Sequence, residues 1–333
     1  MPGASPYERD SKFDDSLRPS SFDEFIGQKK SVQNLQIAIK AARKRKEALD
    51  HVLFSGLPGL GKTTLARLIA FEMKGQLHTT MGPILKKPGD LVGTLTKLED
   101  GDILFIDECH RMLADVEEFL YTAMEDFQIS INMDSGMAGR TITLPLKRFT
   151  LVGATTREGL LSEPFRSRFG ILEKLEWYPT TELVRILQRS SKILKTELDD
   201  ESAALLAQRA RGTPRIANRY LRRVRDLADV KSAKKISRTI TSEALGMLGV
   251  DEAGLEEMDR KILKTLVSHG VPVGIKTLAV AVGEQEDTIE EVYEPYLIQN
   301  HFLVRTSRGR KATEKAAKHL GEEPVRDEQQ RLF

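Results

Sequence analysis

The sequence of 333 residues predicts an α/β fold, in which a parallel sheet with helices on both faces and an inserted β-hairpin is followed by a small all-α domain and a winged helix. Three observations support this prediction. Apolar runs alternate with helical segments from residue 17 to about residue 178, which is typical of a parallel sheet. Helical spacing of apolar residues then continues to about residue 250. Three helical segments and a terminal β-turn occupy residues 251–321.

Short apolar runs mark the expected strands of the sheet, as buried parallel strands would. They are His51–Ser55, Ile103–Ile106, Phe149–Gly153 and Ile171–Leu175. A different pattern, with period two, covers Gln128–Met133 and resumes at Arg140–Leu144 after a Gly-containing segment. We expect this part to form the inserted hairpin.

The remaining regions are expected to be helical. In residues 179–250 the candidates are Glu182–Leu194, Glu201–Arg211 and Arg215–Val230. Between the last two, Gly212 is expected at C′, Thr213 as the N-cap and Pro214 as the first helical residue. In residues 251–321 the candidates are a helix around Leu255–Leu266, helices Gly274–Val282 and Glu286–Gln299, and a strand Phe302–Thr306. The polar ends, residues 1–16 and 322–333, are expected to be disordered tails.

The composition excludes several classes of protein. With 51 Lys and Arg against 49 Asp and Glu, the chain has no overall attraction to nucleic acid, so any basic patch must be local. A single cysteine, Cys109, excludes a disulfide framework and suits a reducing compartment. No apolar run is long enough for a membrane span or a signal peptide. We therefore expect a cytoplasmic protein with no membrane partner.

One motif indicates phosphate binding. Residues Gly56–Thr63 read Gly-Leu-Pro-Gly-Leu-Gly-Lys-Thr, between a strand-like run and a helix. The glycines allow backbone N–H groups to surround phosphates, and the helix N-terminus adds its positive dipole end. Lys62 is placed to reach the β- and γ-phosphates, and the Thr63 hydroxyl to bind Mg²⁺. The alternative, a glycine-rich turn that binds nothing, requires this combination to arise by chance.

Two later strands end in polar residues suited to hydrolysis. Asp107 and Glu108 follow the run Ile103–Ile106, so Asp107 is expected to orient Mg²⁺ and Glu108 to polarise the attacking water. A solvated turn is the alternative. Thr155 or Thr156, at the end of another strand, is expected to hold the water or the γ-phosphate.

Arginines extend this apparatus. Arg166 and Arg168 lie on a short segment before the last strand, where one of them is a candidate for a finger that acts on a neighbouring subunit; a surface salt bridge is the alternative. Arg215 lies in the first turn of its expected helix, where the dipole disfavours a cation by about 0.3–1 kcal/mol. A bound triphosphate would reverse this cost, which favours a nucleotide-sensing role.

Taken together, these segments resemble those of AAA+ ATPases, and more narrowly those of the RuvB family, the bacterial motors of Holliday-junction branch migration. The resemblance covers residues 17–321. Its motifs are Gly56–Thr64, Asp107–His110, Gly153–Arg157, Arg166–Arg168 and Gly212–Arg215. More specific marks are Leu17–Pro19, Phe25–Gln28, Lys87–Asp90, Glu125–Phe127, Glu294–Gln299 and Arg305–Arg310.

The resemblance implies an ATP hydrolase that uses Mg²⁺, assembles as a homo-hexamer ring and translocates double-stranded DNA in recombination and repair. Its implied protein partners are RuvA, which binds the junction, and a RuvC-type resolvase. It implies a site for adenosine at Leu17, Arg18 and Tyr178, and one for phosphates and Mg²⁺ at Gly59, Gly61, Lys62, Thr63, Thr64 and Asp107. It further implies residues near the nucleotide at Glu125, Asp126 and Phe127, a trans finger at Arg168 with Arg166 as second choice, and a sensor at Arg215.

In the family the inserted hairpin docks on RuvA. The apolar candidates here are Ile129, Ile131, Met133, Met137, Ile142 and Leu144, although the apolar face of a hairpin more often packs on its own core. The sequence departs from the family's common pattern in two places. Cys109 stands where the family commonly has Ile, and the hairpin tip, Asp134–Gly139, lacks the usual Gly-Pro turn.

The C-terminal region carries its positive charge in an unusual place. The helix that would read bases in a sequence-specific winged helix is acidic, whereas Arg305, Arg308, Arg310 and Lys311 lie on the following turn. We expect this wing to bind backbone phosphate without base readout. A clamp loader or protein remodeller would lack DNA-stimulated motor activity, and the basic wing argues against it. A nucleotide-switched transcription regulator would need a basic recognition helix.

Overall fold

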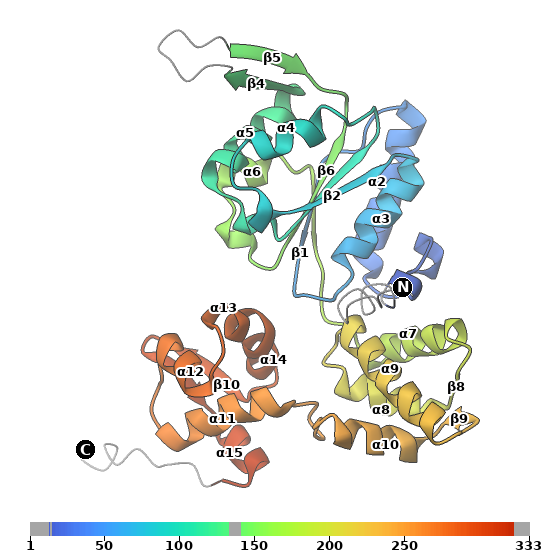
Figure 1. Ribbon diagram of the computed structural model, residues 1–333, viewed down its shortest axis with the longest axis vertical. Coiled ribbons are helices and arrows are strands. Elements are labelled where there is room, and N and C mark those ends of the chain that lie inside the picture. Colours follow the sequence, from blue (N-terminus) through green and yellow to red (C-terminus); the bar gives the residue numbers. More distant parts are fainter. Residues whose placement is uncertain (1–12, 14, 133–140, 323–333) are drawn as a thin grey trace, which may run out of the picture. The chain divides into compact units, whose positions relative to one another are not determined.

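The computed structural model describes residues 13, 15–132 and 141–322. The chain forms two compact units, Met1–Tyr178 and Pro179–Phe333 (Figure 1). The expected tails fall for the most part outside the described residues. Phe13, Asp15 and Ser16 are nevertheless helical, so regular structure begins before residue 17.

A five-stranded parallel sheet forms the centre of the first unit. Its order is β2 (Leu77–Met81), β3 (Ile103–Asp107), β6 (Thr150–Thr155), β1 (Val52–Ser55) and β7 (Ile171–Lys174). The four strands expected from apolar runs are confirmed. Strand β2 was not expected, because it lies at an edge, carries polar residues and is half-exposed, so it lacks a continuous apolar run.

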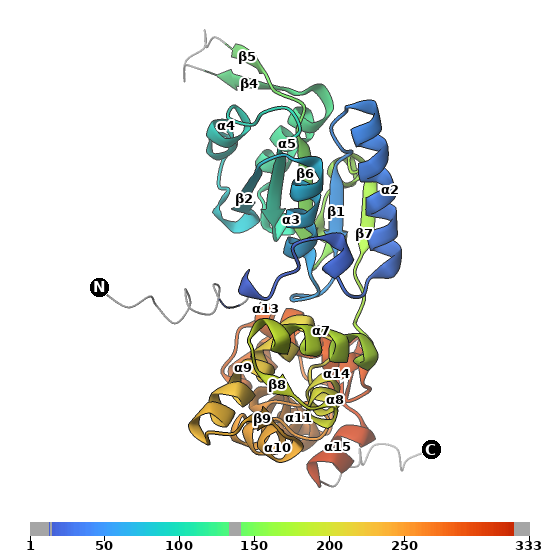
Figure 2. The ribbon, with the colours of Figure 1, turned by 90° about the vertical axis from the view of Figure 1, so that its right-hand side faces the viewer.

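Helices cover both faces of the sheet (Figures 1 and 2). On one face lie α2 (Lys29–Arg45) and α3 (Lys62–Met73), and on the other α5 (Ala114–Asp126) and α6 (Glu163–Ser167). Alternate strand residues such as Leu53, Leu104 and Ile106 pack in one cluster with α5 and α6. The unit also contains α4 (Gly89–Leu95) and the short 3₁₀ segments Phe22–Glu24, Gly82–Ile84, Cys109–Arg111 and Glu158–Leu160.

The expected hairpin is present as an antiparallel pair, β4 (Gln128–Asn132) and β5 (Thr141–Pro145). At its base lies His51, which is 9% exposed. The backbone N–H of Leu151 donates to His51 Nδ1 over 2.8 Å, so Nε2 carries the proton and donates to Met124 O at 3.2 Å. Burial lowers the pKa of His51 below its ordinary value. This histidine is therefore held neutral between strands β1 and β6 and helix α5.

His51 predicts a defined pH dependence of stability. Because its pKa is lower in the folded than in the unfolded chain, its contribution is fully present above pH 6.5 and is lost as the pH falls towards the folded pKa, by about 1.4 kcal/mol per pH unit between the two values. Urea unfolding between pH 5 and 7.5 measures this. His51→Gln should flatten the profile relative to wild type, whereas His269→Gln, at an exposed histidine, should leave it unchanged; an equal slope in all three proteins contradicts the assignment.

The second unit contains the expected helical domain and winged helix. The helical domain consists of α7 (Thr180–Ile193), α8 (Asp200–Arg209), α9 (Pro214–Val230), α10 (Arg238–Met247) and the paired short strands β8 (Glu197–Leu198) and β9 (Lys235–Ile236). The winged helix consists of α11 (Glu257–His269), α12 (Ile275–Val282), α13 (Glu286–Thr288), a π-helical stretch Ile289–Tyr293, α14 (Glu294–Gln299), β10 (Leu303–Thr306), β11 (Gly309–Ala312) and α15 (Glu314–Leu320). Helices α10 and α15 were not among the candidate helices. In the described parts of both units, no helix has the length and apolar character that crossing a membrane requires.

Several helix boundaries differ from expectation by one or two residues, and two of the differences have a structural reason. Helix α8 ends at Arg209 rather than Arg211, and both Arg211 (φ +53°) and Gly212 (φ +64°) are left-handed. Arg211 leaves the helix because its side chain turns to a buried carboxylate described below. Thr213 is the N-cap residue and Pro214 the first residue of α9, as expected. The expected helix Glu286–Gln299 is interrupted by the π-helical stretch, because Pro295 has no N–H to continue the α-helical pattern.

Candidate nucleotide site

The phosphate-binding loop lies at the C-terminal end of β1. Gly56, Gly59 and Gly61 have φ values of +142°, +79° and +108°, which only glycine adopts without strain. A Cβ at Gly56 would lie 2.8 Å from Leu175 O, and one at Gly61 would lie 3.2 Å from the Phe25 ring. The three glycines therefore form a backbone cradle in which Gly56 and Gly61 leave little room for side chains, which fits a polyphosphate.

Helix α3 begins directly at this cradle, with Gly61 as N-cap and Lys62 as its first residue. Lys62 is 6% exposed, and its Nζ donates to Gly56 O at 2.6 Å and Leu57 O at 3.0 Å. The ammonium group thus lies over the loop. Thr63 and Thr64 follow in the first turn and are half-buried. The residues present fit a nucleotide triphosphate, with the lysine at the phosphates and the Thr63 hydroxyl available for a cation.

Of the expected adenosine residues, Tyr178 lies beside the same loop. Tyr178 is buried, and its hydroxyl donates to Leu60 O at 3.2 Å. Leu17 is buried as well. Arg18 Nε pairs with Asp15 Oδ1 at 2.9 Å, and Arg67 on α3 contacts the same oxygen at 3.3 Å. These contacts place Leu17 and Arg18 next to α3.

The strand-end acids lie at the same edge of the sheet, because β3 and β6 run parallel to β1. The backbone of Glu108 adopts the left-handed conformation (φ +48°), and its N–H donates to Asp107 Oδ1 at 3.0 Å. Glu108 Oε2 accepts from the Thr156 hydroxyl at 3.4 Å and lies 3.4 Å from His110 Nδ1. The two acids are thus fixed at the end of β3, Asp107 by the N–H of Glu108 and Glu108 by Thr156 and His110. In the described residues no three His, Cys, Asp or Glu side chains gather as a metal cluster, so a cation there would rely on Thr63, Asp107 and phosphate oxygens.

The structure separates the two threonine candidates. Thr155 is 0% exposed; its Oγ1 accepts from Arg157 N at 2.9 Å and lies 3.0 Å from His110 Nδ1. Its neighbour Thr156 instead contacts Glu108. Thr155 therefore contributes through its backbone, whose carbonyl accepts from Gly56 N at 3.1 Å and ties β6 to the loop.

A second group of polar residues lies at the other end of the sheet, where the parallel strands begin. Arg168 precedes β7, pairs with Glu125 Oε2 at 2.7 Å, donates to the Tyr121 hydroxyl and lies 4.5 Å from the centre of the Tyr121 ring. Glu125 belongs to the last turn of α5, next to Met124, whose carbonyl contacts His51 at the start of β1. Strand β1 separates this point from the loop by roughly 13 Å at 3.3 Å per residue.

The expectation that Glu125, Asp126 and Phe127 lie near the nucleotide therefore fails within one chain. The physical reason is the direction of the sheet, since Phe127 packs against His51 and Phe149, which precede their strands. Arg166, the second choice for the finger, is half-buried on α6. Arg215 is the second residue of α9 and is exposed.

The hairpin candidates divide into three groups. Ile129 is 1% exposed and belongs to the core, so its expected contact with a partner is wrong. Ile131 and Leu144 pack partly on the same core, while Ile142, which pairs with Ile131 across the hairpin, is 42% exposed. The face packs on its own domain near the base of the hairpin and becomes accessible towards Ile142. Met133 and Met137 lie outside the described residues.

The wing arginines are not equivalent. Arg305 on β10 and Arg310 on β11 lie opposite each other, and both donate through Nε to the buried carboxylate of Glu294 at 2.7 Å. Glu290 contacts Arg310 as well. Half of the Arg305 side chain is exposed, against 13% of that of Arg310. Arg308 lies exposed at the turn between the strands.

Several residues around the site were not predicted as functional. The Phe25 ring closes the cradle at Gly61, and Tyr121 orients Arg168. Neither contact shows in periodicity, since both form between distant parts of the chain; Phe25 does belong to the family mark Phe25–Gln28, which gave it no role. Cys109 lies in the core behind the acids, where burial raises the pKa of its thiol, so it packs as a small apolar side chain.

Comparisons with known proteins agree with this geometry. Family models match the chain in succession: "Holliday junction DNA helicase RuvB P-loop domain" at residues 17–175, "RuvB AAA lid domain" at 178–251 and "RuvB C-terminal winged helix domain" at 252–321. A relative from Kosmotoga olearia, called Holliday junction branch migration complex subunit RuvB, is 54% identical over 92% of this chain and 90% of its own. One of the same name from Prosthecochloris aestuarii is 54% identical over 95% of this chain and 93% of its own.

Solved structures show the same likeness. That of the Thermotoga maritima RuvB Holliday junction branch migration motor superposes with a TM-score of 0.85 at 50% identity, over 92% of this chain and 99% of its own. The expected fold class is thereby confirmed in all three of its parts, the P-loop sheet domain, the helical lid and the winged helix. The chain belongs to the RuvB family of AAA+ P-loop ATPases.

Proposed function

We propose that this chain is the ATP-driven motor subunit that translocates double-stranded DNA to drive branch migration of Holliday junctions in recombination and repair. The observation that carries the proposal is the combination, in one chain, of a complete set of phosphate-loop residues with a basic wing in the second unit. The names of its relatives agree with this activity. The parts of the motor are the ATPase domain (17–178), the lid (179–250) and the DNA-binding head (251–321).

Catalysis is assigned to groups at the C-terminal edge of the sheet. Lys62 and the backbone of the glycine loop bind the β- and γ-phosphates, and Thr63 with Asp107 would hold Mg²⁺, which supplies charge neutralisation at the phosphates. Glu108 takes up a proton from the attacking water. Thr156, which already contacts Glu108, orients that carboxylate and takes the water-holding role for which both Thr155 and Thr156 were candidates. Arg215 on the lid senses the nucleotide.

The separation of the two ends of the sheet supports a ring of subunits. Arg168 and Glu125 lie at the opposite end of the sheet from Lys62, so Arg168 acts on the nucleotide of the next subunit. Tyr121 and Glu125 hold its guanidinium in place and raise its pKa further above the ordinary value, Tyr121 most strongly. The assembly is a homo-hexamer ring around DNA, with RuvA bound at the exposed part of the hairpin near Ile142 and a RuvC-type resolvase acting on the same junction.

The wing binds the DNA backbone without reading sequence. Arg308→Ala should weaken binding to duplexes of different sequence by the same factor and lower the slope of log K against log[salt] by about 0.9, the share of one phosphate contact. Titrations with labelled duplexes at several salt concentrations measure both quantities. Lys44→Ala, which removes an exposed charge in the first unit, serves as the control. A loss confined to particular sequences contradicts this role.

The proposed activity is tested by dissociation of a synthetic four-way junction. The purified protein with RuvA and ATP should separate the arms, whereas omission of ATP or of Mg²⁺ should prevent it. A protein that hydrolyses ATP on DNA but leaves every junction intact refutes branch migration while preserving the ATPase assignment.

A further inference from the structure

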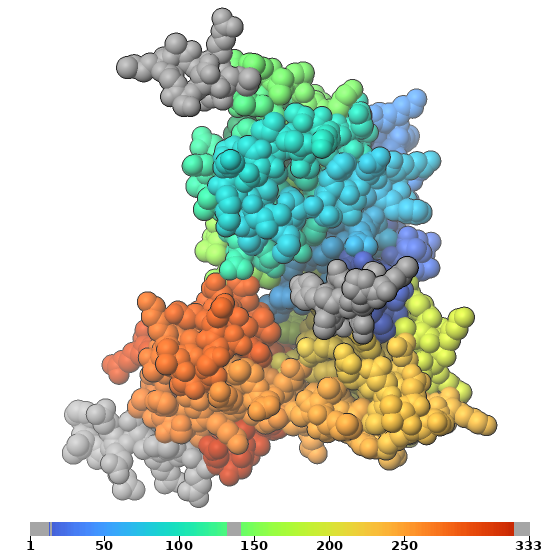
Figure 3. Space-filling model, in the orientation of Figure 1, coloured from blue at the N-terminus to red at the C-terminus, as the bar shows by residue number. Residues whose placement is uncertain are grey.

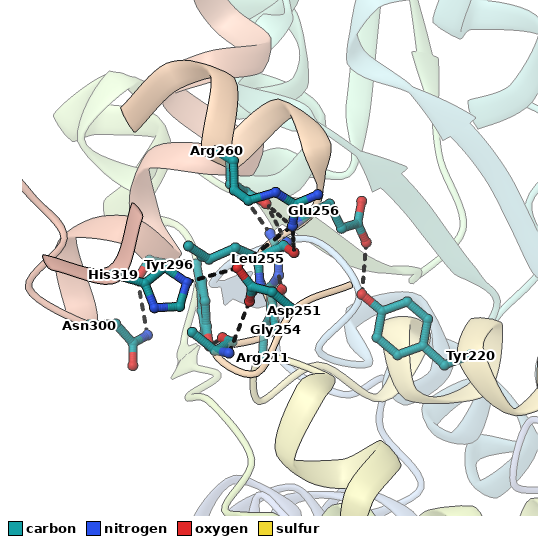
Figure 4. Close-up of polar contacts among 12 residues, drawn as sticks. Arg211, Tyr220, Asp251, Gly254, Leu255, Glu256, Arg260, Tyr296, Asn300 and His319 are labelled. Carbon is teal, nitrogen blue, oxygen red and sulfur yellow. Dashed lines mark hydrogen bonds and ion pairs between the residues drawn. The ribbon is translucent and has the colours of Figure 1, made fainter. Parts of the chain in front are cut away.

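Polar contacts join the lid residues Arg211 and Tyr220 to Gly254 and Glu256 at the start of the winged helix (Figure 4), and a buried ion pair lies among them. Arg211 follows α8 and is 6% exposed, and Asp259 on α11 is 0% exposed. The guanidinium donates to both carboxylate oxygens, to Oδ1 over 3.2 Å, and its Nε donates to Gly254 O at 2.7 Å. It also lies 5.0 Å from the centre of the Tyr296 ring, which comes from α14. All three nitrogens of one lid residue are therefore committed to the winged helix and its lead-in.

A second connection runs from α9 to the same end of α11. Glu256, the N-cap of α11, accepts from the Tyr220 hydroxyl at 2.8 Å and from Arg219. Asp259 accepts from the backbone N–H of Glu256 at 2.7 Å and so completes a capping box. Asp259 thus fixes the end of α11 and the lid arginine at once. Helix α9 begins with Pro214 and Arg215, so the sensor and this connection share one rigid element.

The segment that joins the two domains leaves little room for bending. Gly254 has φ +74°, and a Cβ there would lie 2.7 Å from Arg209 O of the lid. Asp251 accepts from the N–H groups of Ala253 at 2.9 Å and Leu255 at 2.8 Å, and its other oxygen lies 2.8 Å from His319 Nε2 on α15. In the space-filling view, the surfaces of the lid and the winged helix are continuous near this segment (Figure 3).

We propose that Arg211 and Asp259 are positioning residues that hold the lid and the winged helix together as one rigid lever. A rotation of α9 then moves the wing through the same angle. A buried bidentate pair holds the two groups in one relative orientation more strictly than apolar contacts, which tolerate sliding. In the described residues, this lever is the second compact unit, which begins after Tyr178. This proposal rests on the proposed function for its consequence, but the rigidity itself can be measured separately.

The rigidity is tested with two spin labels in the full-length protein. Val230→Cys on α9 and Val280→Cys on α12 replace side chains that are 83% and 84% exposed, and the native Cys109, 1% exposed, does not compete for the label. We expect one narrow distance distribution, unchanged between ADP and a non-hydrolysable ATP analogue. A distance that shifts with nucleotide in the otherwise wild-type protein overturns the proposal.

The role of the pair is tested with Asp259→Asn, which keeps the shape and removes the charge. We expect the label distribution to broaden and the number of junctions dissociated per ATP to fall about tenfold, while DNA-stimulated ATP hydrolysis stays within about twofold of wild type. Asp226→Asn, in an exposed ion pair with Arg223 on α9, is the matched control and should change neither quantity. An Asp259→Asn protein with an unchanged distribution and unchanged coupling refutes the role.

A milder variant covers the case in which Asp259→Asn does not fold. Glu256→Gln leaves the buried pair in place and weakens the connection to Arg219 and Tyr220, together with the N-cap contact that the Glu256 side chain makes to the backbone of Asp259. A smaller broadening is therefore expected, and none at all counts against this second connection. Arg211→Lys, which keeps the charge but loses the fork, should lie between wild type and Asp259→Asn. A rigid lever in a protein that moves no DNA would refute the proposed function and leave this inference standing.

Discussion

Replacing Lys62 by alanine should lower kcat for ATP hydrolysis by at least about 10²–10³-fold, the range measured when one preorganised donor to a developing negative charge is removed. Lys62 Nζ is held over the loop by the carbonyls of Gly56 and Leu57, so its charge is already in place when phosphates enter. No other lysine or arginine is placed at the loop by the contacts described above. Phosphate release in the presence of duplex DNA measures the effect.

The fold of the Lys62→Ala protein should survive, since the glycine backbone and the N-terminus of α3 remain. Circular dichroism and thermal unfolding verify this, and Lys44→Ala controls for the loss of a positive charge elsewhere. Junction dissociation should disappear together with hydrolysis. A Lys62→Ala protein of normal turnover would remove the assignment of the loop.

Arg168→Ala should lower kcat by about 10³-fold or more, as expected for an arginine finger, although the residue lies far from the loop of its own chain. The decisive measurement mixes it with Lys62→Ala. Each protein alone is inactive, but an interface with Lys62 from one chain and Arg168 from the next is complete. Random mixing in equal amounts makes about a quarter of the interfaces of this kind, so hydrolysis should reappear on mixing.

Arg166→Ala, five residues before β7, serves as the control for this experiment. If Arg166 is not the finger, a mixture of Arg166→Ala with Lys62→Ala should show only the ATPase activity expected from the Arg166→Ala protein that it contains. A higher activity would identify Arg166 as the finger. Mixtures of Arg168→Ala and Lys62→Ala that stay inactive, although both proteins assemble, would contradict a shared site.

The parts of the site that the sequence predicts are local ones. The loop from Gly56 to Thr63, the acids after β3 and the N-terminus of α9 depend on residues adjacent in the chain, where turn geometry and strand ends fix side chains directly. The central strands follow from apolar runs for the same reason. Edge strand β2 does not, since its exposed side chains remove the periodic signal.

What the sequence could not predict depends on pairing between distant residues. The wing arginines look alike in sequence, yet Glu294 holds Arg305 and Arg310 and leaves Arg308 at the turn. Likewise Arg211 reads as the last residue of a helix, and only the partner at Asp259 explains why it leaves that helix. The spacing of charged residues along the sequence does not show which of them form ion pairs. Many pairs have the same Coulomb attraction, and the fold buries only one of them.

The position of Lys62 and Arg168 at opposite ends of the sheet also fixes how activity depends on concentration. In a dimer, the Arg168 end of one molecule can meet the Lys62 end of the other, but a twofold axis cannot bring both such pairs together. A dimer therefore has a single competent pocket. An open head-to-tail row always contains one competent pocket fewer than its number of subunits, and closure of the row into a ring supplies the last pocket. ATP turnover per molecule should therefore rise with protein concentration, and it should level off only once closed rings have formed.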